Sequence, residues 1–139
     1  MCLTVSMELF VKQSLCRWTF AVASLLTSCT VVAPSGGPGV TQDTALGPVL
    51  VDAAGMTLYT YDGDLPDKPN CYSLCSVMWP ALEAAADAQP KGEFTIVNRA
   101  TGVRQWEYRR APLYTYRLDS KPGDIDGDGE GGTWHAAKP

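Results

Sequence analysis

Alternating apolar and polar positions predict a protein body made of short β-strands. Residues 103–108 alternate apolar and polar side chains, which is typical of a strand with one buried face. Segments rich in β-branched and aromatic residues predict further strands at 49–52, 56–61, 94–98 and 112–116. Turns join 49–52 to 56–61, 94–98 to 103–108 and 103–108 to 112–116, so the strands are expected to pair mainly antiparallel.

The turns and one Ala-rich segment complete this picture. Gly55 lies at the reversal between the first two strands, where a left-handed backbone suits glycine. Arg110 occupies the corresponding place in the later hairpin, where the same backbone would cost a non-glycine residue about 1 kcal/mol. Residues 80–88 begin with proline and are rich in alanine, which predicts one short helix. The expected fold class is mainly β, a small antiparallel domain with one short helix.

One pattern occurs twice at an offset of 55 residues. The matched positions are Tyr59, Tyr61, Asp64 and Trp79 in the first copy and Tyr114, Tyr116, Asp119 and Trp134 in the second. The pattern predicts two repeats of about 55 residues, at 47–90 and 102–139, within a body spanning 48–139. Tyrosines two positions apart on a strand share a face, so both pairs are expected to pack between the repeats with the tryptophans. The two aspartates are expected to accept backbone N–H groups in turns.

Composition excludes some classes of function. The chain has 139 residues, 45% hydrophobic residues and a formal net charge of −4. These values are ordinary for a globular protein and give no basic surface for nucleic acid. No Ser-His-Asp pattern or phosphate-binding loop is present, and a single histidine leaves little scope for hydrolysis.

The N-terminal residues predict export. Lys12 and Arg17 precede a nine-residue apolar run at 18–26, which is typical of a signal peptide and too short to cross a bilayer. The following Leu26-Thr27-Ser28-Cys29 resembles a bacterial lipobox, which implies a signal peptide at 1–28 and acylation of Cys29. Two or three acyl chains would anchor the protein in the cell envelope. Thr30, where an aspartate would favour the inner membrane, favours the outer membrane or cell surface.

Residues 29–47 are expected to form the lipidated cysteine and a flexible tether, because this segment is rich in proline and glycine. The tether would space the body from the membrane.

Several motifs occur together in a characteristic order. They are the two Tyr-Thr-Tyr-x-x-Asp segments, Cys71-x3-Cys75-x3-Trp79-Pro80, Gln105-Trp106-x-Tyr108, Pro112-Leu113-Tyr114, Pro122-Gly123-Asp124 and Trp134-His135. With the lipobox, this set resembles the bacterial lipoproteins described as a secreted repeat of unknown function. The resemblance covers residues 47–139 and implies export, lipid anchoring and a two-repeat domain. It implies no enzymatic activity.

Cys71 and Cys75 allow two interpretations. In an exported protein, two cysteines without other partners most often form a disulfide, and a loop between them would permit it. The alternative is a copper or redox site in which Met78 and His135 supply further ligands.

An acidic segment near the C-terminus gives a calcium alternative. Asp124, Asp126 and Asp128 match the first three ligand positions of a calcium loop, followed by Gly129. His135 stands where that loop requires a bidentate glutamate, so the segment is also compatible with a solvated acidic turn.

These observations predict a lipid-anchored envelope protein that acts by binding or scaffolding rather than by catalysis. Its expected contacts are the membrane, through acylated Cys29, and an unknown protein or small ligand, with no cofactor required. The alternatives are a copper or redox lipoprotein using Cys71, Cys75 and His135, and a calcium-stabilised interaction module.

Overall fold

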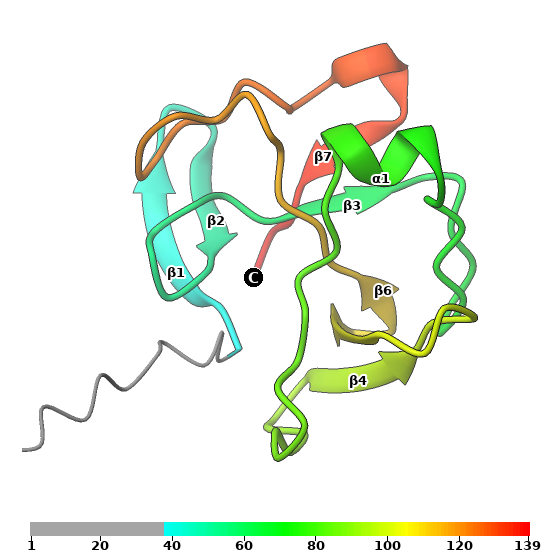
Figure 1. Ribbon diagram of the computed structural model, residues 1–139. Helices are drawn as coiled ribbons and strands as arrows, with labels where there is room; N and C mark the ends of the chain where they lie inside the picture. The colour runs from blue at the N-terminus through cyan, green and yellow to red at the C-terminus, as the bar shows by residue number, and fades with distance from the viewer. Residues whose placement is uncertain (1–37) are drawn as a thin grey trace, which may run out of the picture. The chain divides into compact units, whose positions relative to one another are not determined.

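The computed structural model describes residues 38–139, so the predicted signal peptide, Cys29 and the tether up to residue 37 lie outside the described residues. Figure 1 shows short strands and one short α-helix. In chain order the elements are β1 (Val40–Thr44), β2 (Gly47–Val51), β3 (Tyr59–Tyr61), α1 (Leu74–Met78), β4 (Phe94–Asn98), β5 (Arg104–Tyr108), β6 (Ala111–Pro112), the 3₁₀ turn η1 (Glu130–Gly132) and β7 (Trp134–Ala136). All strand pairs are antiparallel, which confirms the predicted mainly β class. Within residues 38–139, no helix has the length and apolar character needed to cross a membrane.

Each repeat contributes an antiparallel hairpin. β1 pairs with β2, and β4 pairs with β5, which continues into β6. β4 and β5 lie where the sequence predicts strands. β1 corrects the predicted extent of the tether, because residues 40–44 form a strand inside the segment 29–47. The ladder with β2 satisfies the backbone groups of β1 that face it, and β2 in turn buries Val49 and Val51 in the core.

The motif strands pair across the repeats. β3 of the first repeat pairs with β7 of the second, with Tyr59 opposite Ala136. In the reverse direction, the N–H of Thr115 in the second repeat donates to the carbonyl of Pro80 in the first at 2.9 Å. Tyr59 and Tyr114 exchange two backbone hydrogen bonds, at 2.8 and 3.0 Å. Each repeat therefore supplies the strand partner of the other, and corresponding segments of the two repeats make corresponding contacts.

The predicted helix is wrong in position. The α-helix is α1 at Leu74–Met78, whereas Pro80–Ala88 is extended at first and then turns. Leu82 and Ala84 donate their N–H groups to carbonyls of the second repeat at 2.9 Å and are buried, while Glu83 between them is exposed. Burial at every second residue is the strand pattern. Pairing with the second repeat therefore overrides the helical preference of the alanines.

The two corresponding turns both adopt left-handed backbone. Gly55 has φ of 83°, and in the second hairpin Arg109 and Arg110 have φ of 49° and 69°. The substitution of arginine for glycine therefore leaves the backbone conformation in place. The strain of two non-glycine residues is retained at the tip of the β5–β6 turn.

The repeat offset changes by one residue between elements. The N–H of Leu50 donates to the carbonyl of Ala137, and the N–H of Trp106 donates to that of Leu82, both at 2.8 Å. Leu50 and Trp106 are thus structural counterparts although they are 56 positions apart rather than 55. The shift arises because the turn after β5 is one residue shorter than the turn after β2. Trp106 consequently occupies the position in the second repeat that Leu50 occupies in the first.

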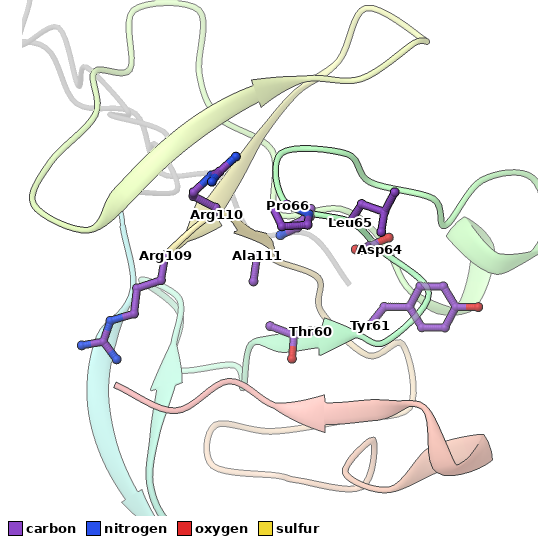
Figure 2. Close-up of a pocket in the computed structure, with 9 residues that line it drawn as sticks. Thr60, Tyr61, Asp64, Leu65, Pro66, Arg109, Arg110 and Ala111 are labelled. Carbon is purple, nitrogen blue, oxygen red and sulfur yellow. The ribbon is translucent and has the colours of Figure 1, made fainter.

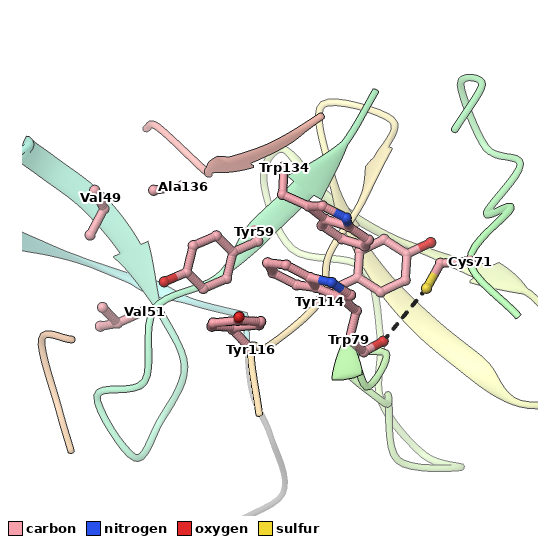
Figure 3. Close-up of a cluster of buried hydrophobic side chains, with 9 residues drawn as sticks. All are labelled: Val49, Val51, Tyr59, Cys71, Trp79, Tyr114, Tyr116, Trp134 and Ala136. Carbon is pink, nitrogen blue, oxygen red and sulfur yellow. Dashed lines mark hydrogen bonds between the residues drawn. The ribbon is translucent and has the colours of Figure 1, made fainter. Parts of the chain in front are cut away.

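The apolar side chains form two clusters. The first is rich in aromatic rings (Figure 3) and contains Val49, Val51, Tyr59, Cys71, Trp79, Tyr114, Tyr116, Trp134 and Ala136. The second is mainly aliphatic and contains Leu50, Leu58, Leu82, Ala84, Trp106, Leu113 and Ala137. Both clusters draw residues from both repeats, so neither repeat has a core of its own.

Candidate functional site

The tyrosine and aspartate of the repeated motif bond across the repeats. The hydroxyl of Tyr59 donates to Asp119 Oδ2 at 2.7 Å, and the hydroxyl of Tyr114 donates to Asp64 Oδ2 at 2.9 Å. The second oxygen of each carboxylate accepts a backbone N–H from the loop that follows it, at 2.6 Å for Asp64 and 3.1 Å for Asp119. The polar atoms of the motif are therefore satisfied inside the domain.

The remaining motif rings form a stack of four. In order, the rings are Tyr61, Trp134, Trp79 and Tyr116, with centroids 4.5, 3.7 and 4.2 Å apart. The two indoles at the centre are parallel to within 1° (Figure 3). Tyr59 and Tyr114 pack edge-on against Trp79 and Trp134, with centroids 5.4 and 5.2 Å apart. Aromatic pairs of this kind add about 0.5–1.5 kcal/mol each beyond the area they bury, so the motif stabilises the contact between repeats.

The two aspartates lie in different electrostatic surroundings. Burial raises the pKa of Asp64 and of Asp119 above the usual range. The positive charge of Arg99 opposes the rise in the pKa of Asp64. Asp126 and Asp124 instead add to the rise in the pKa of Asp119. Asp64 thus has a buried cation nearby, and Asp119 has neighbouring anions.

Cys71 and Cys75 are joined by a disulfide, with their Cα atoms 5.3 Å apart. Cys71 lies in the loop before α1 and is fully buried, whereas Cys75 lies within α1. The prediction of a loop at both cysteines is therefore wrong for Cys75. A bond from the loop into the first turn of the helix avoids the poor geometry of two cysteines four apart on one regular helix.

The structure does not assemble the copper set. The sulfur atoms of Cys71 and Cys75 are bonded to each other, and His135 Nε2 lies 3.0 Å from Asp62 Oδ2 at the surface. Met78 packs against the aromatic cluster. Among residues 38–139, no group of three or more His, Cys, Asp or Glu side chains is placed to hold a metal ion.

The three aspartates of the acidic loop also serve separate structural contacts. Asp124 Oδ2 accepts the backbone N–H groups of Ser120 and Lys121, at 2.8 and 3.0 Å. Asp128 Oδ1 accepts the N–H of Ala136 at 2.8 Å, and Asp126 donates its own N–H to Asp119. The loop is therefore held by turn hydrogen bonds rather than arranged as a calcium site.

Two residues that contact the buried motif side chains or their neighbours belong to none of the sequence motifs, namely Arg99 and Gly127. Arg99 is 6% exposed, and its guanidinium donates to the side-chain oxygen of Gln105 and to the carbonyl of Cys71. Gly127 is buried so closely against the rings that an added Cβ would lie 2.8 Å from Trp79 and 2.9 Å from Tyr59. Only the three-dimensional contacts identify these positions, because a single arginine in a turn or glycine in a Gly-rich loop is unremarkable in sequence.

A surface pocket of about 180 Å³ opens beside the β5–β6 turn (Figure 2). It is lined by Thr60, Tyr61, Asp64, Leu65, Pro66, Arg109, Arg110, Ala111 and Pro112. Strands that meet at the bridge between Tyr59 and Tyr114 form its two sides. The sequence indicates the aspartate and tyrosine here, but not that the arginine turn would face them.

Gly55 and Arg110 make matching backbone contacts in the two repeats. The N–H of Gly123 donates to the carbonyl of Gly55, and the N–H of Asp67 donates to that of Arg110 in the matching contact. A Cβ on Gly55 would lie 2.9 Å from Pro122. Arg110 carries a Cβ at the corresponding place, and its side chain pairs with Asp67 in the loop that contains Pro66.

Comparison with known proteins identifies the repeats independently. A family described as a secreted repeat of unknown function matches residues 40–83 and 95–138. The two matches are each 44 residues long and start 55 residues apart, which confirms the repeat period and gives a shorter repeat unit than the predicted 55 residues. Their bounds also begin earlier than the predicted 47 and 102, because the hairpin strands β1 and β4 belong to the unit. No curated protein and no solved structure matches the chain. Because the family covers more than half of the sequence, the chain belongs to this family of secreted repeats.

Proposed function

We propose that the protein is a lipid-anchored component of the bacterial cell envelope whose two-repeat domain binds a partner without catalysing a reaction. The observation that carries the proposal is the internal use of the repeated motif. Its hydroxyls and carboxylates bond to each other and to backbone, and its rings stack on one another. The motif therefore builds a rigid body, and binding falls to surface features that differ between the repeats.

The turn pocket of Figure 2 is the surface that supports this role best. Leu65 is 62% exposed at its edge. The β5–β6 turn contributes two exposed arginines to the lining, and their side chains extend in different directions (Figure 2). Arg109 pairs with Glu93, and Arg110 pairs with Asp67. The pocket thus offers a small apolar surface beside neutralised charged groups, which suits a short protein segment better than a free anion.

The anchoring part of the proposal rests on the lipobox and on the secreted character of the family. Cys29→Ser is expected to abolish incorporation of an alkyne-labelled fatty acid and to move the protein from the detergent phase to the aqueous phase. Cys16→Ser, which lies in the predicted signal peptide, is the matched control and is expected to change neither readout. Label retained by Cys29→Ser would overturn lipid anchoring.

The binding part is tested in the intact envelope by photo-crosslinking. A photoreactive residue at Leu65 is expected to give one discrete adduct, and the same residue at Leu74, which is 85% exposed on α1, is the control. Adding Arg110→Gly is expected to weaken the Leu65 adduct, because it removes a side chain that lines the pocket and its pair with Asp67. Equal adducts from both positions, or an adduct insensitive to Arg110→Gly, would contradict binding at the turn pocket.

A further inference from the structure

A second pocket, of about 340 Å³, lies between the disulfide segment and the turn that joins β4 to β5. It is lined by Tyr72, Ser73, Ser76, Pro80, Ala81, Glu83, Arg99, Thr101 and Val103. It shares no residue with the turn pocket. Ligand binding in this second pocket is therefore independent of the proposed partner surface.

Arg99 gives this pocket a buried positive charge. Its guanidinium is bonded to two neutral oxygens, from Gln105 and Cys71, and lies 4.3 Å from the ring centroid of Tyr72. Within residues 38–139, no carboxylate forms an ion pair with Arg99. The charge of Arg99 acts on Asp64, but that carboxylate is engaged by the Tyr114 hydroxyl and a backbone N–H. A guanidinium buried with neutral acceptors is costly, and an anion in contact with it would offset that cost.

The rest of the lining selects the kind of anion. Each terminal nitrogen of Arg99 donates one N–H, to Gln105 or to Cys71, and carries a second N–H. Such a pair of donors matches a planar carboxylate. Glu83 is exposed at the pocket and carries the opposite charge, which disfavours a dianion such as phosphate and favours a ligand that also carries an ammonium group. Pro80, Ala81 and Val103 offer an apolar wall for a short side chain.

We propose that this pocket binds a small free α-amino acid, with its carboxylate at Arg99 and its ammonium group toward Glu83. The pocket volume falls within the range of small-molecule sites. The disulfide stabilises the site, because the Cys71 carbonyl holds the guanidinium and the loop between the two cysteines supplies Tyr72 and Ser73. Ligand binding in the envelope would thus depend on oxidised cysteines.

The test titrates the full mature lipoprotein in detergent with glycine and L-alanine while amide chemical shifts are recorded. Acetate, methylamine, glycine methyl ester and inorganic phosphate are the comparison probes. We expect saturable shifts near Thr101 and Val103 with the two amino acids, weaker shifts with acetate, and no saturable shift with methylamine, the ester or phosphate. No saturable response to either amino acid, or an equal response to the ester, would overturn the proposal.

Two variants separate the contacts. Glu83→Gln leaves the fold intact because the side chain is exposed, and it is expected to lower glycine affinity about fivefold without changing acetate affinity. Arg99→Gln is expected to abolish binding of both, and exposed Arg117→Gln is its control. If Arg99→Gln does not fold, the Glu83→Gln comparison decides alone. Glycine affinity unchanged in Glu83→Gln would refute the ammonium assignment and with it the amino-acid ligand.

Discussion

The Asp64 centre and the Asp119 centre begin from the same repeated motif and end in different surroundings. Both aspartates accept a hydroxyl from the tyrosine of the other repeat and a backbone N–H from the following loop. Around Asp64 the chain adds Arg99 and a disulfide loop. Around Asp119 it adds Gly127 and an acidic loop. The shared residues build the common core, and the residues that differ between the repeats change what surrounds each aspartate.

The two hairpin turns show the same division. Gly55 and Arg110 share a left-handed backbone, and both accept a loop N–H at their carbonyl. Gly55 lets a proline pack directly on its turn, because a Cβ at position 55 would lie 2.9 Å from Pro122. The turn at Arg110 has a pocket beside it, which Arg110 and Pro66 both line.

The largest loss of stability is expected from adding a methyl group at Gly127, the buried glycine of the Asp119 centre. In Gly127→Ala the new methyl group would overlap three rings, including Tyr116 at 3.0 Å. We expect a loss at the upper end of ~1–3 kcal/mol in the free energy of unfolding, measured by denaturant titration. Gly129→Ala is the control, since its added Cβ meets nothing within 4 Å and its positive φ costs about 1 kcal/mol. Equal losses in the two variants would show that the rings are not packed as described.

The two tyrosine–aspartate bonds are expected to differ in strength. Tyr59→Phe leaves Asp119 short of a donor and also removes the oxygen that accepts the Gly127 N–H at 3.3 Å. Tyr114→Phe removes the hydroxyl that donates to Asp64, but Asp64 still has the charge of Arg99 nearby. Both losses are expected within ~1–3 kcal/mol, with Tyr59→Phe the larger. Chemical denaturation of the two variants at the same pH measures the difference, and the reverse order would contradict the role assigned to Arg99.

The pH dependence is expected to be smaller and to have a defined sign. The pKa values of Asp64, Asp119 and Glu107 are raised mainly by burial, so the folded protein retains protons that the unfolded chain releases. Stability should therefore fall as the pH rises from about 4 toward neutrality. Asp124 acts oppositely at lower pH, because the Lys121 ammonium lowers its pKa.

Asp119→Asn isolates one contribution to that slope. The melting temperature of the variant should change less between about pH 4 and pH 7 than that of the unmodified protein, because the substitution removes one carboxyl group whose pKa is raised. Asp43→Asn, at an exposed position of β1, is the control and should follow the unmodified profile. Parallel profiles for all three proteins would be inconsistent with a buried, proton-linked Asp119.

The smallest effect is expected at the arginine turn. Arg110→Gly relieves the left-handed strain and gives up only a pair between exposed side chains, so the melting temperature should rise by a few degrees. Calorimetry measures the shift. A clear fall in melting temperature would mean that the Asp67 contact outweighs the backbone strain.

The sequence supports the β class and the aromatic packing because both follow from local patterns. Tyrosines spaced by two residues on a strand, repeated with a tryptophan at a fixed distance, indicate a shared buried face. Local pattern alone favours a helix at 80–88, because the carbonyls that capture Leu82 and Ala84 come from the distant second repeat. The role of Arg99 is absent from the sequence pattern for a similar reason, since its acceptor Cys71 is 28 positions away.

We expect the two repeats to form one cooperative unit, because each motif strand pairs with the other repeat and each aspartate bonds to the other repeat's tyrosine. Scanning calorimetry of the mature protein, alone and with Tyr59→Phe or Tyr114→Phe, measures this cooperativity. A single transition is expected in every case, with equal calorimetric and van't Hoff enthalpies, and it should move as a whole in either variant. Two transitions, each shifted by a substitution in only one repeat, would contradict it.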